Sequence, residues 1–489
     1  GLGDVYKRQL IESISVTGGH LASNLGVVEL TMALHLCFNL PKDKIVWDVG
    51  HQSYTHKILT GRKDGFSSLR QYGGMSGFPK ADESDCDCFN TGHSSTSISA
   101  GLGLATARQV TGDDYHVVSV IGDGALTGGM AYEALNNASS VKGNFIIVLN
   151  DNNMSISENV GGISQYLSGF RTADAYRDFK NNVMNSLNHI PIYGERMVKH
   201  IRNTKSSIKQ LFIPGMFFEE MGIIYLGPVD GSDIKKMCRV FDEAKRVDGP
   251  VLVHVLTKKG AGYGPAERYP SRFHGAEPFV IETGLPKNKR TKANYTDVFS
   301  TVMKKLGERN PKVVAITAAM ADGTGLRRFH RNFPDRFFDV GIAEAHATTF
   351  AAGLAKAGLI PVFAVYSSFL QRAFDQILHD VCIQNLHVIF AIDRAGLVGS
   401  DGETHQGIFD ISYLSVIPNM TIMAPKNKWE LSDMMKFAVV YDGPIALRYP
   451  RGAAYDGLKE IRQPIELAKS ELIRKGSTVA IMALGSMVK

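Results

Sequence analysis

Two stretches of the chain, HVVSVIGDGALTGGM at residues 116–130 and GNFIIVLNDNNMS at residues 143–155, decide the fold. Each begins with an apolar run that is typical of a buried strand, and each then reaches glycine or polar residues. The residues between them predict a helix that begins near Gly128. This order of strand, helix and strand indicates a parallel sheet in which the ends of the two strands meet at one site.

The two strand ends carry residues that suit a divalent cation. Asp123 lies in a Gly-Asp-Gly turn, and Asn152 follows it 29 residues later. A backbone carbonyl near Met154, water and phosphate oxygens would complete a shell of hard oxygen ligands. Gly122 and Gly124 allow the backbone to approach phosphates closely. A Gly-Asp-Gly turn also follows many ordinary strands, but its spacing to Asn-Asp-Asn favours Mg²⁺ that bridges a diphosphate.

The composition is that of a large soluble enzyme. The chain has 489 residues, of which 44% are hydrophobic and 21% charged, and this is enough for two or three domains with cores. No apolar run is long enough to span a bilayer and the start, GLGDVYKRQL, lacks a signal pattern, so we expect a cytoplasmic location. The cysteines are too few and scattered for a disulfide framework and predict free thiols: Cys37, Cys86, Cys88, Cys238 and Cys382.

The net charge of +6 is concentrated in one segment. Residues 171–211 hold eight Lys or Arg against three Asp or Glu, which places +5 of the total there. This segment is rich in Asn, Lys and Ser and predicts a surface helical excursion or a flap. We expect no nucleic-acid partner, because no stacking pattern of aromatic residues and no known binding motif accompanies the charge.

Alternating apolar runs and amphipathic stretches predict an α/β fold with two parallel sheets, each covered by helices on both faces. In residues 1–290 we expect helices over 26–38 and 94–109, and strands at KIVWDV, CFNTG, HVVSVIG, NFIIVLN and VLVHVLT. The polar stretch PKNKRTKANY separates this domain from a second one over residues 291–462. The strands of the second domain are predicted at VVAITAA, FFDVGIA, PVFAVYS, HVIFAID, MTIMAP and PIALRYP.

Residues 463–489 predict the start of a third, truncated domain. TVAIMALG at 478–485 is nearly all apolar, which is typical of a strand inside a parallel sheet, but only four residues follow it. Such a strand without neighbours would favour association with other chains. At the other end, GLGDVYKRQ has no clear partner element. We therefore expect a chain that is cut at both ends.

Ten motifs follow one another along the chain: VTGGHLASNLG, WDVGHQSYTHKILTGR, TGHSSTSISAGLG, IGDGALTGGMAYEALNNA, NDNNMSISENVG, TKKGAGY, FDVGIAEAHATTFAAGLA, YSSFLQRAFDQ, DRAGLVGSDGETHQG and RYPRG. In this order they resemble the 1-deoxy-D-xylulose-5-phosphate synthase family, which is similar to transketolase, over residues 10 to 489. The resemblance implies a homodimeric transferase that uses thiamine diphosphate and Mg²⁺. It implies that pyruvate and D-glyceraldehyde 3-phosphate condense, with release of carbon dioxide, in the first step of non-mevalonate isoprenoid synthesis.

The resemblance also gives each domain a part in cofactor binding. Residues 1–290 would bind the diphosphate and Mg²⁺, residues 291–462 would bind the aminopyrimidine, and residues 463–489 would begin a C-terminal transketolase-type domain. Both complete domains would have the thiamine-diphosphate-binding fold. Two alternatives stay open: a transketolase-like ketol transfer without decarboxylation, and a non-catalytic cofactor-binding fragment.

Glu344, after the strand FFDVGIA, is the candidate acid–base group. By resemblance it shares a proton with the aminopyrimidine ring, for which it should be buried with a raised pKa. The alternative is a carboxylate that complements the dipole of the helix AHATTFAAGLA. The family usually has Gln after this Glu, whereas Ala345 stands here.

Histidines beside glycine form a second group of candidates. By resemblance, the cofactor contacts are His51, the turn of Gly92, His93 and Ser94, the residues Gly124 and Ala125, and a packed ring at Tyr263. The resemblance assigns His20, His274 and His405 to substrate handling and proton transfer, for which an imidazole pKa near neutrality is suited. The alternative for Tyr263 is an aromatic residue that anchors a glycine-rich turn.

The phosphate of the acceptor aldehyde calls for arginines. Arg394 and Arg451 follow predicted parallel strands, where side chains converge on the cleft of such a sheet. A guanidinium group can hold phosphate oxygens in a fixed fork. The resemblance completes this acceptor site with Tyr366, Arg372 and Asp401. The alternative for a single arginine is a surface ion pair.

Overall fold

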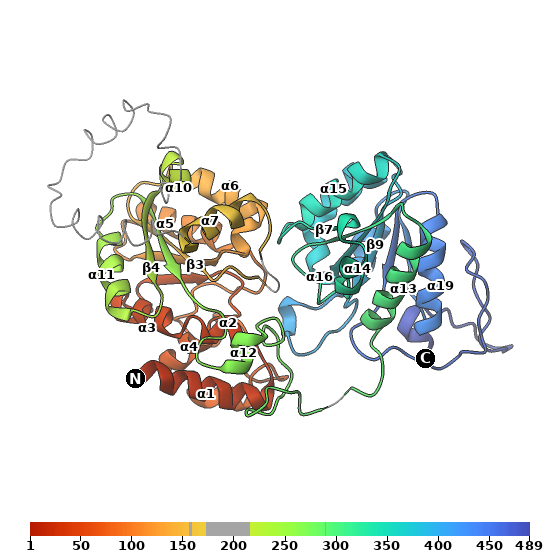
Figure 1. The fold of residues 1–489 in the computed structure, drawn as a ribbon, viewed down its shortest axis with the longest axis horizontal. Helices are drawn as coiled ribbons and strands as arrows, with labels where there is room; N and C mark the ends of the chain where they lie inside the picture. The colour runs from red at the N-terminus through yellow and green to blue at the C-terminus, as the bar shows by residue number, and fades with distance from the viewer. Residues whose placement is uncertain (156–158, 173–215, 289) are drawn as a thin grey trace.

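The computed structural model describes residues 1–155, 159–172, 216–288 and 290–489, and two parallel sheets organise this part of the chain (Figure 1). Strands of the first sheet lie in the order β1-β2-β3-β5-β4, and strands of the second in the order β10-β11-β9-β8-β6-β7. Every pairing of neighbouring strands is parallel. The two-domain α/β architecture predicted from the apolar runs is therefore confirmed.

The first sheet is built from strands whose successive side chains face opposite ways. In β3, Phe145, Ile147 and Leu149 pack against α5, α6 and α7, while Ile146 and Val148 pack against α3 and α11. A strand that is covered on both faces is apolar where the helices cover it, as β3 is before its last two residues, Asn150 and Asp151. The strands are β1 (Lys44–Trp47), β2 (Val117–Gly122), β3 (Phe145–Asp151), β4 (Ile224–Asp230) and β5 (Pro250–Leu256).

Helices flank the first sheet on both faces (Figure 1). Those described are α1 (Leu2–Thr17), α2 (Leu21–Leu25), α3 (Val28–Cys37), α4 (Tyr54–Lys57), α5 (Ser97–Thr111), α6 (Gly129–Ala138), α7 (Gly162–Thr172), α10 (Met216–Glu220), α11 (Ile234–Ala244) and α12 (Gly264–Arg268). The helices expected over 26–38 and 94–109 correspond to α3 and α5. The predicted basic excursion at 171–211 lies outside the described residues, except for its first two.

The second sheet repeats the same arrangement. Phe299 and Met303 of one helix pack on the same face as Leu431 and Met435 of another, and Ala347 lies on the opposite face. The strands are β6 (Val313–Thr317), β7 (Phe337–Asp339), β8 (Ile360–Tyr366), β9 (Ile389–Asp393), β10 (Thr421–Met423) and β11 (Ile445–Arg448). The helices are α13 (Tyr295–Arg309), α14 (Arg327–Asn332), α15 (Glu344–Lys356), α16 (Ser367–Leu370), α17 (Phe374–Gln376), α18 (Asp410–Ser415) and α19 (Lys428–Val440).

Two predicted strands are absent from the described part of the chain, and one observed strand was not predicted. CFNTG forms no strand, and Phe89 within it is exposed. TVAIMALG forms no strand either: Ile481 and Met482 are exposed, and the segment meets no neighbouring strand in the described residues. The structure therefore gives no third sheet at 463–489. Conversely, β4 was not predicted, because its Gly227-Pro228 pair weakens the strand pattern at the edge of the sheet.

The N-terminal segment also differs from expectation. GLGDVYKRQ opens α1, whose Leu10 and Ile14 are fully buried in a cluster with Leu21 and Tyr54. Lys7 pairs with Glu29 of α3 at 2.6 Å. The segment thus has partner elements, and α1 packs beneath the loops that reach the candidate site.

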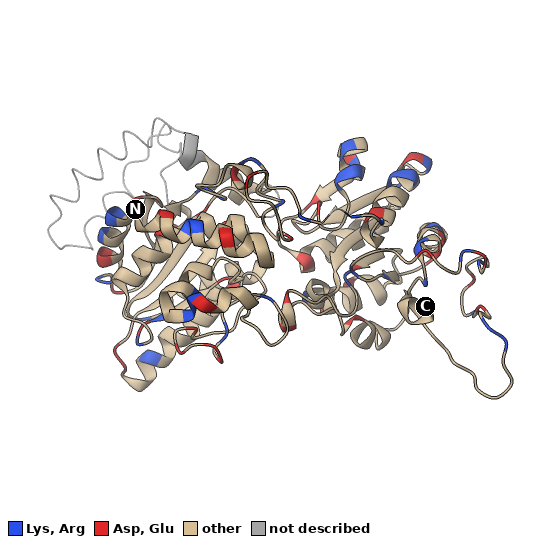
Figure 2. Ribbon diagram, turned by 90° about the horizontal axis from the view of Figure 1, so that it is seen from below, with Lys and Arg blue, Asp and Glu red and all other residues tan. Residues whose placement is uncertain are grey.

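Charged residues lie mainly on the helices and loops around the two sheets (Figure 2). All five cysteines are free thiols, as predicted. In the described part of the chain, no helix is long and apolar enough to cross a membrane.

Candidate active site

One cavity receives loops from the carboxyl ends of strands in both sheets. The first sheet contributes residues after β1, β2 and β3, and the second contributes residues after β6, β7 and β8. The space is about 1040 Å³, including part that is open to solvent, which suits a cofactor-sized molecule. Parallel sheets place their binding crevices at this end. Contacts such as Ile342 N to Thr127 Oγ1, at 3.1 Å, join the two domains beside the cavity.

The structure brings the predicted cation ligands to this cavity. Asp123, Asn152 and Met154 all line it, and Gly124 and Ala125 lie beside them. Asp123 Oδ2 accepts a hydrogen bond from Asn159 Nδ2 at 2.8 Å, and Asn152 Oδ1 accepts one from Met154 N at 3.0 Å. These bonds fix both side chains at the ends of β2 and β3.

The backbone at this end of the cavity fits a bound diphosphate. A Cβ added at Gly124 would lie 2.8 Å from Ser155 Cβ, so only glycine allows the two loops this close together. No group of three or more His, Cys, Asp or Glu side chains forms a metal cluster within the described residues. The donors on offer are one carboxylate, one amide and one carbonyl, and this set suits Mg²⁺ that keeps water and phosphate ligands.

Lys259 is a cavity residue to which sequence reasoning gave no role. Its ammonium group donates to Ser155 O and lies 3.2 Å from His274 Nδ1. Burial lowers its pKa to about 8, while the charge of Asp123 acts in the opposite direction. A buried cation near Asp123 suits an anionic group. Its signal in the sequence is the lysine pair of the motif TKKGAGY, directly before the glycine-rich turn.

Three predicted histidines meet on one wall. Gly19 and Ala276 exchange both backbone hydrogen bonds, at 2.9 and 2.8 Å, and this pairing brings His20 and His274 together. The His51 ring lies 5.0 Å from that of His274 and 5.5 Å from that of His20. Asn24 Nδ2 donates to the carbonyls of both His20 and His51 and so fixes their spacing.

Aromatic residues hold the remaining two histidines. His405, from the second domain, stacks on Phe78 with centroids 5.2 Å apart and lies 5.3 Å from His93. His93 Nε2 lies 2.8 Å from the carbonyl of Thr404, which joins the domains. Phe369 packs edge-on against both imidazoles.

The cavity imidazoles are neutral at pH 7, contrary to the expectation of pKa values near neutrality. Burial lowers the pKa of His51 to about 3 and that of His405 to about 4. Burial likewise holds the pKa values of His20 and His274 well below their usual range. A ring in this state can donate through one nitrogen and accept through the other. Each histidine can therefore relay a proton without carrying a lasting charge.

The buried carboxylate of Asp48 holds the chain directly after the turn of Gly92, His93 and Ser94. Asp48 Oδ1 accepts from Ser95 N at 2.7 Å and Oδ2 accepts from Ser97 N at 3.0 Å. Arg372 of the second domain donates to Ser94 Oγ at 3.1 Å and also to the Ser94 carbonyl. The turn is thus anchored by both domains. Asp48 was not among the predicted residues.

Glu344 enters the cavity at the first residue of α15. Its side chain is buried, and burial raises its pKa, although the charge of Arg372 opposes the rise. A buried carboxyl that can hold a proton fits the acid–base interpretation. Its position at a helix N-terminus also fits the dipole interpretation, so both apply to the same residue. Ala345 is half-buried next to it.

The predicted acceptor residues divide into two groups. Arg372 lines the cavity, whereas the other four are not among its lining residues: Tyr366, Arg394, Asp401 and Arg451. The Arg394 guanidinium lies 3.9 Å from the centre of the Tyr366 ring, and Tyr366 stacks on Phe369, 5.6 Å away, which reaches the cavity. Arg451 Nη1 donates to Val398 O at 3.0 Å, and Asp401 pairs with Arg70 of the first domain. Of the predicted arginines, only Arg372 lines the cavity, and Arg394 is linked to it through the rings of Tyr366 and Phe369.

Tyr263 does not reach the cavity. It is buried against Phe273 and Phe279, with ring centroids 5.6 and 6.0 Å away, and its hydroxyl donates to Ile281 O at 2.6 Å. The expected packing on a cofactor is therefore not supported. The alternative interpretation applies, because the ring anchors the glycine-rich turn that carries Lys259.

Comparison with known proteins bears on the whole chain. A family model described as 1-deoxy-D-xylulose-5-phosphate synthase matches residues 2–257, and one described as the transketolase pyrimidine binding domain matches residues 291–455. The synthase of Lachnoclostridium phytofermentans is 59% identical over 483 residues, which are 99% of this chain and 77% of that protein. The synthase of Natranaerobius thermophilus is 57% identical over 490 residues, 100% of this chain and 78% of that protein.

Among solved structures, transketolase from Campylobacter jejuni aligns with 91% of this chain and 77% of its own, at 18% identity and a TM-score of 0.42. The curated relatives, by contrast, share more than half of their residues with this chain along nearly all of its length. With these matches the chain belongs to the 1-deoxy-D-xylulose-5-phosphate synthase family of transferases.

Proposed function

We propose that this protein uses thiamine diphosphate and Mg²⁺ to condense pyruvate with D-glyceraldehyde 3-phosphate, giving 1-deoxy-D-xylulose 5-phosphate and carbon dioxide. One observation carries the proposal: the buried carboxyl of Glu344 enters the same cavity as Asp123 and Asn152, which come from the other domain. Membership of the family supports the choice of substrates.

In this proposal the first domain holds the charged end of the cofactor. The Asp123 carboxylate, the Asn152 amide oxygen and the Met154 carbonyl would bind Mg²⁺. The Lys259 ammonium and the backbone around Gly124 would bind phosphate oxygens. Thiamine diphosphate, when bound, supplies the carbanion chemistry that these residues cannot supply themselves.

Glu344 would hold a proton against the aminopyrimidine ring. Its raised pKa allows the carboxyl to carry that proton at neutral pH, because the buried charged form is destabilised. The neutral imidazoles of His20, His51, His274 and His405 would then accept or donate protons at the substrate oxygens. Phe78 and Phe369 would exclude water from this wall.

The acceptor aldehyde would bind toward the second domain. Arg394 and Arg451 would hold its phosphate, while Arg372 lines the cavity, where its charge acts on Glu344. The family resemblance further implies a homodimer, which light scattering of the purified protein would test.

Labelled pyruvate tests the proposal. We expect labelled carbon dioxide and labelled 1-deoxyxylulose 5-phosphate when pyruvate, D-glyceraldehyde 3-phosphate, thiamine diphosphate and Mg²⁺ are all present. Turnover of a ketose phosphate donor without carbon dioxide release would instead indicate a transketolase-like transfer. Cofactor binding without turnover of either donor would support a non-catalytic role.

A further inference from the structure

A loop of the first domain carries one aromatic side chain into the cavity wall. Phe78 is 3% exposed, its ring stacks on His405 at an interplanar angle of 17°, and its centroid lies 5.5 Å from that of His20. It therefore touches one histidine from each domain. Yet Phe78 lies outside any helix or strand, so something other than regular secondary structure must fix it.

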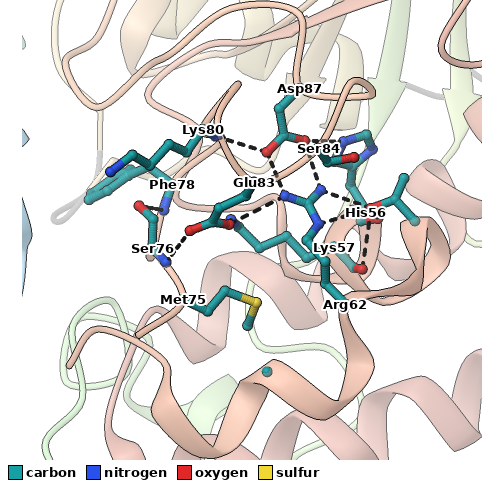
Figure 3. A network of polar contacts seen from close by, with 12 residues as sticks. His56, Lys57, Arg62, Met75, Ser76, Phe78, Lys80, Glu83, Ser84 and Asp87 are labelled. Carbon is teal, nitrogen blue, oxygen red and sulfur yellow. Dashed lines mark hydrogen bonds and ion pairs between the residues drawn. The ribbon is translucent and has the colours of Figure 1, made fainter. Parts of the chain in front are cut away.

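Two carboxylates hold the backbone on either side of this ring (Figure 3). Glu83 Oε1 accepts from Ser76 N at 2.6 Å, two residues before Phe78. Asp87 Oδ2 accepts from Lys80 N at 2.8 Å, two residues after it. Between them, Phe78 N donates to Ser76 Oγ at 3.2 Å. We name Glu83 and Asp87, with the amides that they bind, the carboxylate clamp.

Cations from the α4 region hold the clamp in turn. Lys57 Nζ lies 2.6 Å from Glu83 Oε2, and its side chain is fully buried. Arg62 donates to both oxygens of Asp87, at 2.7 and 2.8 Å, and lies 3.4 Å from Glu83. His56 Nε2 lies 2.8 Å from Asp87 Oδ1. Figure 3 shows these side chains converging on the two carboxylates.

The protonation states follow from the partners. Burial alone would raise the pKa of Asp87, but hydrogen bonds from Arg62, His56 and Lys80 N hold it well below its usual range, so Asp87 is ionised. An ionised carboxylate only accepts, and His56 therefore donates through Nε2. Its Nδ1 accepts from His35 Nε2, 2.9 Å away. Asp87 thus accepts hydrogen bonds from Arg62, His56 and Lys80 N.

A buried network of this kind adds little to the free energy of unfolding, but it can hold a loop in one conformation. Desolvation of buried ion pairs offsets most of their attraction, and apolar residues of similar volume often stabilise a fold as well. Directional hydrogen bonds, however, fix an irregular loop in one conformation. From the two amides that flank Phe78, we propose that Glu83 and Asp87 are positioning residues, which act through Ser76 and Lys80 to hold Phe78 against His405.

Amide hydrogen exchange of residues 75–80 tests the clamp without any assay of turnover. Glu83→Ala should speed exchange at Ser76 about tenfold, because one hydrogen bond is lost, while Asp87→Ala should do the same at Lys80. Glu83→Gln keeps an acceptor oxygen and should restore part of the protection. If Glu83→Ala destabilises the fold by leaving Lys57 unpaired, the double variant Lys57→Met/Glu83→Ala removes that charge and should still expose Ser76.

The second domain offers a matched control. Glu430 also accepts from a backbone amide and pairs with a buried lysine: Lys426 N lies 2.5 Å from its Oε2 and Lys426 Nζ 2.8 Å from its Oε1. Its side chain is 16% exposed, against 18% for Glu83. Glu430→Ala should leave exchange at Ser76 and Lys80 unchanged. Equal acceleration in both variants would overturn the clamp, because it would report a general loss of stability.

A double-mutant cycle tests the link to the cavity, and this arm alone rests on the proposed function. If Glu83 acts through Phe78, Glu83→Ala should change kcat or KM in the wild type but by less than about twofold in a Phe78→Ala background. Additive effects would overturn the proposed route. If the wild type forms no product, the proposed function fails, whereas the exchange measurement still decides whether the carboxylates hold the loop.

Discussion

Two histidines of the first domain with buried ring nitrogens, His51 in the cavity and His56 beside the clamp, use those nitrogens differently. In the cavity, His51 Nδ1 is buried and has no hydrogen-bond partner among the described residues. Beside the clamp, His56 has partners at both nitrogens, His35 at 2.9 Å and Asp87 at 2.8 Å. An unmade hydrogen bond in the interior is costly, so such an atom needs a reason.

This difference distinguishes cavity groups that a ligand can bind from groups that only hold the loop in place. Ser23 Oγ and Gln52 Oε1, which also belong to cavity residues, are buried without partners in the described part of the chain, as His51 Nδ1 is. Groups of this kind are available to a ligand. The residues around Asp87 form hydrogen bonds with one another and with backbone amides. They therefore fix the conformation of the loop. Ligand-facing and supporting polar groups should therefore respond differently to substitution.

The largest effect is expected at the cation position. Asp123→Ala should abolish binding of thiamine diphosphate in the presence of Mg²⁺, as measured by calorimetry, because it removes the one charged ligand that the protein supplies to the proposed shell. The circular dichroism spectrum should not change. Asp230→Ala is the control, since Asp230 also ends a strand of this sheet but does not line the cavity. Normal cofactor affinity in Asp123→Ala would remove this residue from the ligand-facing group.

Glu344 should affect chemistry more than binding. Glu344→Gln keeps the shape but cannot exchange a proton, so release of the cofactor's reactive proton should slow by about two orders of magnitude or more, while the cofactor stays bound. Proton exchange followed by NMR measures this. Asp297→Asn, at the first turn of α13, controls for the helix-dipole interpretation. Comparable slowing in both variants would show that Glu344 only supports its helix.

The acceptor arginines should give a smaller and more selective loss. Arg394→Ala or Arg451→Ala should cost about 2 kcal/mol in kcat/KM for D-glyceraldehyde 3-phosphate, roughly thirtyfold, because a charge-assisted contact is lost. Use of pyruvate should hardly change. The control acceptor is D-glyceraldehyde, and the control variant is Arg327→Ala, which breaks an exposed ion pair with Asp322 in the same domain. Equal losses with both acceptors would contradict phosphate binding.

Most strands, and the meeting of Asp123 with Asn152 at one cavity, could be predicted because short-range patterns determine them. The first five residues of Phe145–Asp151 are apolar because helices cover both faces, and Asp123 follows a strand of the same kind. TVAIMALG has the same pattern but forms no strand, since a parallel strand also needs neighbours to pair with, and periodicity does not report them. The apolar pattern of a segment thus predicts that it can form a strand. Whether it forms one depends on neighbouring strands with which it can pair.

The support around Phe78 could not be predicted, because its partners come from irregular chain. Glu83 and Asp87 bind amides seven residues earlier, Ser76 and Lys80, in a loop without periodicity. The low pKa values of the cavity histidines were missed for a related reason. Sequence gives the usual pKa of an imidazole, whereas the shift in His51 comes from burial beneath loops of both domains.

The smallest expected effect concerns stability in acid. It tests whether a histidine of the cavity, His405, differs from one beside the clamp, His35. Burial lowers the pKa of both His405 and His35 to about 4, from about 6.5 in the unfolded chain. Below pH 6.5 the unfolded state therefore binds more protons, and stability falls as the pH falls from about 6.5 to about 4. Each histidine should therefore lower the free energy of unfolding at pH 5.5 by about 1 kcal/mol relative to its value at pH 7.5. In His405→Asn and in His35→Asn, the urea concentration at the unfolding midpoint should fall less between pH 7.5 and pH 5.5 than it does in the wild type.

Similar gains in the two variants would mean that burial sets the pKa whether or not the ring has partners, and the distinction between site and support would then concern geometry alone. A gain in His405→Asn only would mean that the partners of His35 compensate for its burial. His379 on the surface supplies a control of opposite sign: its hydrogen bond to Asp380 raises its pKa, so its contribution is present at low pH and disappears as the pH rises. His379→Asn should therefore leave the acid sensitivity in place, and a loss of sensitivity in this variant would show that buried histidines are not its source.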